Sequence, residues 1–133
     1  MTTSTWFFPA LDIASRLVAR DYAKSYVGRE TKDNALVNHL QAWEQANGAA
    51  ANARTAAKSL TLEDIYLDEM SHMPVLVAFN LHLNNAGLLN VPVLIHFSDY
   101  RQVQNCPVAH HIRVYMNSVL VWDLQVSSAS LNY

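Results

Sequence analysis

Residues 75–97 read VLVAFNLHLNNAGLLNVPVLIHF, and this stretch decides the predicted fold. Apolar side chains occupy every second position on both sides of the segment Asn84-Asn85-Ala86-Gly87. An alternation with a period of two residues is typical of a β-strand, and a segment rich in Asn and Gly is typical of a turn. The stretch therefore predicts two antiparallel strands, over residues 75–84 and 91–97.

The sequence that follows continues the same pattern. Residues 109–116 and 119–126 alternate around Asn117-Ser118, which suits a two-residue hairpin turn. Residues 98–107 are polar and are expected to form a loop. The second half of the chain therefore predicts a four-stranded antiparallel meander.

The first half of the chain has apolar residues at helical spacing. Residues 9–27 are expected to form a helix, because Pro9 suits the first helical position and Gly28 suits the position just beyond the end. A second helix is expected from Thr31, a suitable N-cap, to about Asn47.

Two further segments leave alternatives open. Residues 49–58 contain six alanines, which favour a helix, although a flexible connection is the alternative. Residues 62–70 follow a Thr61–Asp64 pattern that is similar to a capping box and predicts a short helix. A strand is the alternative there, because Leu62 and Tyr66 are also compatible with a sheet.

These elements predict a single α+β domain over residues 1–133, with N-terminal helices packed on the four-stranded meander. Residues 1–8 and 127–133 are expected to be frayed tails. The order of elements resembles the cystatin-like and nuclear transport factor 2-like architecture. The resemblance covers element order alone, and the early strand between the first helices is not evident. Proteins of that shape include pocket enzymes, ligand binders and dimeric scaffolds.

Charged residues are distributed unevenly along the 133 residues. Residues 1–70 carry 16 charged side chains, whereas residues 71–133 carry 4. Both faces of the predicted sheet are therefore poor in charge, and a face of this kind is expected to line a pocket or to contact another subunit. This predicts a non-enzymatic binding or protein-interaction module that forms a homodimer through the sheet face. The alternative is a small pocket enzyme of isomerase or hydrolase type, with a histidine general base and a small apolar substrate.

Five residues on the predicted strands are candidates for ligand binding: His82, His96, Arg113, Tyr115 and Trp122. A histidine titrates near neutral pH and so suits a general base. Arg113, expected opposite Trp122, could bind a carboxylate or a phosphate. The structural alternative for each is a half-exposed sheet histidine or an arginine packed along its aliphatic stem. No catalytic residue is assigned, since no nucleophile, phosphate-loop or zinc-protease motif occurs.

The remaining patterns limit the partners that we expect. Cys106 is the single cysteine, and with His110 and His111 it falls short of the four ligands of a structural zinc site, so neither metal nor cofactor is expected. The net charge of −2 and the lack of a basic cluster argue against nucleic acid. No apolar run reaches the ~20 residues of a membrane helix. The N-terminal residues lack the features of a signal peptide, which predicts a cytoplasmic protein.

Overall fold

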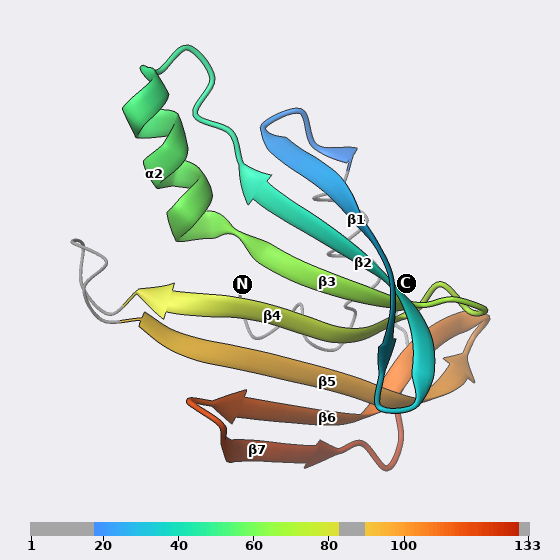
Figure 1. The fold of residues 1–133 in the computed structure, drawn as a ribbon. Coiled ribbons are helices and arrows are strands. Elements are labelled where there is room, and N and C mark those ends of the chain that lie inside the picture. The colour runs from blue at the N-terminus through green and yellow to red at the C-terminus, as the bar shows by residue number, and fades with distance from the viewer. Residues whose placement is uncertain (1–17, 83–89, 131–133) are drawn as a thin grey trace.

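The computed structural model describes residues 18–82 and 90–130. Seven strands in this part of the chain form one antiparallel sheet, in which each strand pairs with the next along the sequence (Figure 1). The strands are β1 (Tyr22–Lys32), β2 (Ala35–Glu44), β3 (Glu63–Asp68), β4 (Pro74–His82), β5 (Asn90–Val103), β6 (Cys106–Met116) and β7 (Val119–Gln125), and helix α2 (Ala51–Thr61) joins β2 to β3.

The predicted α+β fold is wrong, because strands occupy most of the first half of the described chain. Residues 22–27 of the first expected helix belong to β1, and the second expected helix falls on the end of β1 and on β2. Local spacing misled the prediction here: β2 pairs on both sides, with β1 and β3, and such pairing outweighs helical propensity. Residues 9–17 and the tail 1–8 lie outside the described residues.

The structure answers which alternative is correct for the two segments that the sequence left open. The alanine-rich segment is helical, and α2 contacts β2 and β4 at one end of the sheet (Figure 1). None of its residues is buried, as expected for a helix with few large apolar side chains. The Lys58 ammonium lies 4.2 Å from the centre of the Trp43 ring. Residues 63–68 form β3, so the strand alternative is the correct one there.

The four predicted strands of the second half correspond to β4–β7, but the expected loop over residues 98–107 is wrong. Strand β5 continues to Val103 and β6 begins at Cys106, with Gln104 and Asn105 as the turn. Both turn residues have a positive φ, 50° and 66°, and two such residues match the twist of a tight hairpin. The turn expected between β4 and β5 falls on residues 83–89, outside the described residues.

Two other hairpins use the same kind of turn. Asp33 and Asn34, with φ of 49° and 64°, join β1 to β2. Asn117 and Ser118, with φ of 50° and 66°, join β6 to β7, which confirms the predicted turn. Non-glycine residues therefore adopt the left-handed conformation in all three turns, and this conformation is costly for residues that carry a Cβ atom.

The main hydrophobic core lies on one face of the sheet, which we call the apolar face. Ile65, Val77, Ile95 and Val114 are consecutive register partners across β3–β6, and each is 1% exposed or less. Branched side chains in such a row pack well against one another on a pleated surface. The core therefore belongs to the central strands.

The opposite face, which we call the mixed face, carries a second row of register partners across β2–β7. The row consists of His39, Tyr66, Leu76, His96, Arg113 and Asp123. Apart from Leu76, polar and ionisable side chains therefore cross β2–β7 at one level. A charge-poor sheet was expected from the sequence, and two of the four charged residues of the second half, Arg113 and Asp123, lie in this row.

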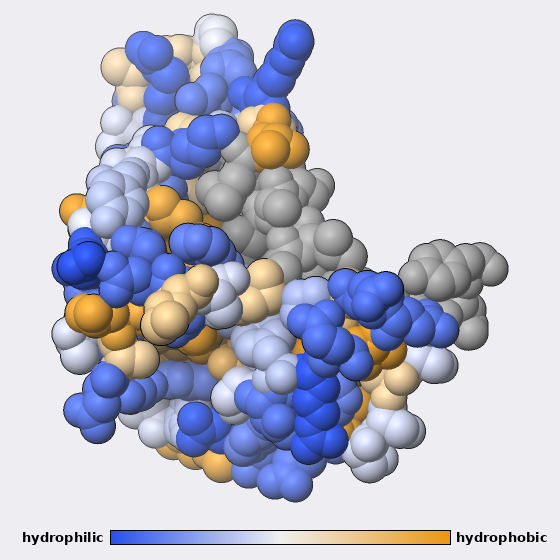
Figure 2. Space-filling view, turned by 90° about the vertical axis from the view of Figure 1, so that its right-hand side faces the viewer, coloured by the Kyte–Doolittle hydropathy of each residue, from blue (hydrophilic) through white to orange (hydrophobic). Residues whose placement is uncertain are grey.

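The sheet curves, so that β1 and β2 are inclined to β5–β7 (Figure 1). Seen from the side on which the β3–β4 connection lies, the surface is mainly hydrophilic, with hydrophobic residues in small separate patches (Figure 2). Within residues 18–82 and 90–130, no helix has the length and apolar character needed to cross a membrane.

Candidate functional site

A cavity of about 240 Å³ lies on the mixed face, and we call it the His96–Arg113 cavity. The tip of the β1–β2 hairpin supplies one wall, and β4, β5 and β6 supply the rest. The lining residues are Lys32, Asp33, Ala35, Val75, Leu76, His96, Phe97, Ser98 and Arg113. Segments from both halves of the sequence therefore build one site.

His96 faces this cavity from β5. Its ring meets that of Tyr115 edge-on, with centroids 5.4 Å apart, and its Nδ1 lies 3.9 Å from Asp33 Oδ2. Burial lowers the pKa of His96, and the positive charge of Arg113 lowers it further, whereas Asp33 opposes this shift. His96 is therefore neutral at neutral pH, and a neutral imidazole offers one N–H donor and one nitrogen acceptor.

Arg113 lies directly opposite His96, on β6. Its Nη1 is 3.5 Å from the Tyr115 hydroxyl, and its Nε is buried without a hydrogen-bond partner. No carboxylate among the described residues forms an ion pair with it: its register partner Asp123 instead lies 2.6 Å from Nε2 of His111. A buried donor without a partner costs about 1–3 kcal/mol, so this guanidinium is suited to an acceptor from outside the chain.

The rest of the cavity combines a second cation with apolar walls. Lys32 places its ammonium 4.9 Å from the centre of the Tyr66 ring. Asp33 is the single carboxylate among the lining residues, and 83% of its side chain is exposed to solvent, which screens its charge. Val75 and Leu76 provide apolar surface. The lining of the cavity therefore combines two cationic side chains, Lys32 and Arg113, with apolar surface.

A buried polar cluster lies further along the same row. His39 Nε2 is 2.7 Å from Asp64 Oδ1, and His39 Nδ1 is 3.1 Å from Glu30 Oε2. The His39 ring stacks on that of Tyr66 with centroids 4.3 Å apart, and Gln41 donates a 3.0 Å hydrogen bond to Asp64. The helix expected from Thr31 to about Asn47 gave no sign of this cluster, because Glu30 and Asp64 come from other strands.

The structure brings together three of the five candidate residues, His96, Arg113 and Tyr115. Trp122 does not join them: it pairs with Val114, because the register of β6 and β7 shifts between Val114 and Tyr115. The expected placement of Trp122 opposite Arg113 is therefore wrong. Trp122 belongs to the level of the apolar core row.

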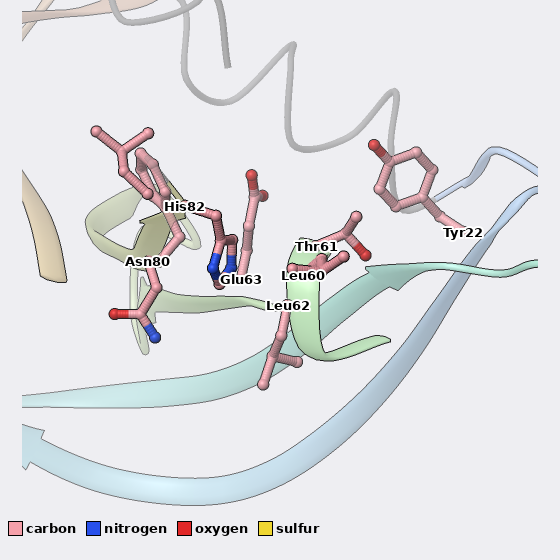
Figure 3. A pocket seen from close by; sticks show the side chains of 9 residues that line it. Tyr22, Leu60, Thr61, Leu62, Glu63, Asn80 and His82 are labelled. Atoms are coloured by element: carbon pink, nitrogen blue, oxygen red, sulfur yellow. The ribbon is translucent and has the colours of Figure 1, made fainter. Parts of the chain in front are cut away.

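His82 lies at the other end of β4. Its Nδ1 is 2.7 Å from Oδ1 of its register partner Asn90. Asn90 and His96 are six residues apart on β5, so the backbone positions of Asn90 and His96 are separated by roughly 20 Å. It lines a second cavity, of about 320 Å³, beside the end of α2. In Figure 3, His82 and Tyr22 lie toward opposite ends of this cavity, with Glu63 and Thr61 between them. His82 and His96 therefore serve different cavities.

The two histidines considered for a metal site contact other groups. His110 Nδ1 is 2.9 Å from the carbonyl oxygen of Val108, and His111 contacts Asp123. Within the part of the chain that the structure describes, no three His, Cys, Asp or Glu side chains form a group that could hold a metal ion.

No protein-family model and no curated protein matches the chain. Among solved structures, the chain is similar to that of a putative outer membrane lipoprotein-sorting protein domain from Vibrio parahaemolyticus. The TM-score is 0.57 at 16% sequence identity, and the match covers 81% of this chain and 41% of that one. The similarity concerns the fold alone. The chain thus spans about two fifths of the length of this structural neighbour.

Proposed function

We propose that the chain is a non-enzymatic binding module for a small organic anion with an apolar body, held in the His96–Arg113 cavity. The observation that carries this proposal is the Arg113 guanidinium, which has a buried donor without a partner and forms no ion pair with a carboxylate among the described residues. Arginine binds carboxylates through two parallel hydrogen bonds, so a ligand carboxylate would satisfy this group.

The other lining residues suit the same ligand. The N–H of neutral His96 can donate to the carboxylate, and Lys32 adds a second positive charge. An apolar body would contact Val75 and Leu76. Sites for drug-sized ligands enclose about 300–1,000 Å³, so a cavity of about 240 Å³ suits a smaller molecule. The neighbour's description as a lipoprotein-sorting domain also favours a binding role over catalysis.

The alternative of a pocket enzyme uses the same histidine. His96 is neutral and could act as a general base, and Ser98 lines the cavity with it. However, no hydrogen bond joins these two side chains, which activation of a serine nucleophile would need. An enzyme of isomerase or hydrolase type would show turnover that His96→Gln abolishes while binding persists.

Homodimerisation through a sheet face is a separate proposal, which the sequence supports because residues 71–133 carry 4 charged side chains. A dimer of this type would cover the mixed face, and with it the mouth of the His96–Arg113 cavity. Ligand binding and association would then compete, so a saturating carboxylate would shift the protein toward the monomer in sedimentation experiments.

Calorimetric titration with two probes, hexanoate and phenylacetate, tests the binding proposal. We expect saturable binding of both acids and much weaker binding of hexanol and hexylamine, which share the apolar body but lack the carboxylate. Arg113→Leu should weaken hexanoate binding at least about tenfold, or about 1.4 kcal/mol. The matched control is Arg101→Leu, because Arg101 lies outside the cavity and already pairs with Asp99.

Two results would overturn the proposal. One is the absence of saturable binding of either acid to the folded protein. The other is equal affinity of the wild-type protein and Arg113→Leu for hexanoate, which would place the site elsewhere on the chain.

A further inference from the structure

The connection between β2 and α2 contains the one Asn-Gly pair of the sequence, Asn47 and Gly48. The backbone N–H of Ala49 donates a 3.1 Å hydrogen bond to the carbonyl oxygen of Ala46, so the pair occupies the two central positions of a β-turn. Gly48 has a φ of 77°, as the second central residue of a type II turn requires. Both residues of the pair are exposed to solvent.

The reactive groups of this pair are not held by the fold. Among the described residues, none forms a hydrogen bond with the Asn47 side chain or with the backbone N–H of Gly48. A Cβ atom added at Gly48 would meet no other atom within 4 Å, so the space around this residue is open. The Gly48 nitrogen and the side-chain carbonyl carbon of Asn47 are therefore free to approach each other.

We propose that Asn47 is a site of spontaneous deamidation, with water as the co-reactant. The Gly48 nitrogen loses its proton to solvent and attacks Cγ of Asn47, so that an N–Cγ bond forms. The Cγ–Nδ2 bond breaks, and Nδ2 takes up a proton and leaves as ammonia. Water then opens the cyclic imide at either carbonyl and leaves aspartate or isoaspartate. Glycine favours the reaction because it has no Cβ atom to obstruct the attack and adopts a wide range of φ.

Other asparagines among the described residues lack this combination. Each of them is followed by a residue that carries a Cβ atom. Asn38 also accepts a hydrogen bond from the Tyr26 hydroxyl. Asn52 is exposed like Asn47, but it lies in the first turn of α2, and its Oδ1 accepts a 2.9 Å hydrogen bond from the N–H of Ala53. Asn52 is therefore a matched comparison that differs in its neighbour and in its backbone.

Deamidation changes the charge of a cavity of about 260 Å³ that Asn47 lines. The charged residues of its lining are Glu44 and Arg54, whose formal charges cancel. A carboxylate in place of the Asn47 amide therefore changes the formal charge of the lining from zero to −1. The inference is independent of the proposed ligand site, because the two cavities share no lining residue.

Mass spectrometry of the full chain, incubated at neutral and at mildly alkaline pH, tests the proposal. Trypsin cleaves after Lys32 and Arg54, so peptide 33–54 carries both Asn47 and Asn52. Fragmentation of this peptide locates aspartate and isoaspartate, and protein digested without incubation gives the background. We expect conversion at least about tenfold faster at Asn47 than at Asn52, or about 1.4 kcal/mol in activation free energy. Conversion at Asn47 should be faster at the alkaline pH, because the attacking nitrogen must lose its proton.

Two glycine variants separate the local effect from a general one. Gly48→Ala should slow conversion at Asn47 at least about tenfold, because the added Cβ atom obstructs the attack. Gly28→Ala, at the other described glycine with a positive φ, is the control and should leave the rate unchanged. Circular dichroism confirms that each variant folds.

Two results would overturn the proposal, and neither depends on a variant. One is conversion at Asn47 that is no faster than at Asn52 in the same peptide. The other is conversion in the folded chain at least about tenfold slower than in a synthetic peptide of residues 33–54, because the fold would then protect the Asn47 amide.

Discussion

His96 of β5 and Arg113 of β6 lie directly opposite each other on the mixed face of the sheet. The guanidinium and the surrounding burial together lower the pKa of the imidazole. At neutral pH the two side chains therefore offer different interactions to a molecule in the cavity. Arg113 supplies a positive charge, and neutral His96 supplies a hydrogen bond without adding a second charge.

The lowered pKa of His96 sets the sign of a pH effect on stability. The unfolded chain binds a proton at this histidine more readily than the folded chain does, so acidification below about pH 6.5 favours unfolding. Replacing the imidazole by His96→Gln should make the free energy of unfolding fall less steeply with acidification. Urea titrations above and below that pH measure the difference, and parallel curves for both proteins would contradict the assignment.

Two His–Asp pairs have nearly the same distance but differ in burial, so comparing them shows how burial affects their contribution to the free energy of unfolding. His39 and Asp64 are 2.7 Å apart, and His111 and Asp123 are 2.6 Å apart, but the His39 side chain is 9% exposed and that of His111 is 29% exposed. We expect His39→Ala to cost about 1–3 kcal/mol, because the buried Glu30 Oε2 loses the imidazole nitrogen beside it. His111→Ala should cost less than about 1 kcal/mol. Equal losses in chemical denaturation would show that burial does not decide the contribution.

The same histidine shows why the first half of the chain could not be predicted. The spacing of a helical stripe is found at Leu36, His39, Leu40 and Trp43. His39 nevertheless lies on strand β2, where its buried ring contacts Glu30 and Asp64. Both carboxylates come from other strands, one of them 25 residues away. Such non-local contacts leave no local signal, so spacing alone favoured the helix.

Predictions succeeded where the signal was local. The alternation over residues 75–82 and the turn at Asn117-Ser118 depend on neighbouring residues only, and both agree with the structure. Arg113 and Tyr115, two residues apart on β6, lie on one face of the sheet for the same reason. The misplacement of Trp122 has the opposite origin, since a single irregular position in β6–β7 pairing changes every partner beyond it.

The β6–β7 turn offers a stabilising substitution. Ser118 has a φ of 66°, a left-handed conformation that is unfavourable by roughly 1–2 kcal/mol for a residue with a Cβ atom. Ser118→Gly should therefore raise the free energy of unfolding by about 0.5–1 kcal/mol, after the greater entropy of the unfolded chain is subtracted. Thermal unfolding measures the change. Ser127→Gly, outside the strands, is the control and should bring no gain, and equal gains would reject the argument from φ.

Tyr100 makes a hydrogen bond that tests how much one buried hydroxyl contributes to this sheet. Its hydroxyl donates to the carbonyl oxygen of Pro74 at 2.5 Å, and burial raises its pKa, so the donor keeps its proton well into the alkaline range. Tyr100→Phe should cost about 1–2 kcal/mol, because the Pro74 carbonyl loses its partner in a buried setting.

Tyr26 provides the matched control for this substitution. Its hydroxyl donates a 3.0 Å hydrogen bond to Asn38 Oδ1, but the side chain is 61% exposed, so water can replace the lost partner. Tyr26→Phe should therefore change the free energy of unfolding by less than about 0.5 kcal/mol. Urea denaturation of both variants at neutral pH measures the contrast. A loss for Tyr26→Phe as large as that for Tyr100→Phe would mean that the hydroxyl contributes through something other than its burial.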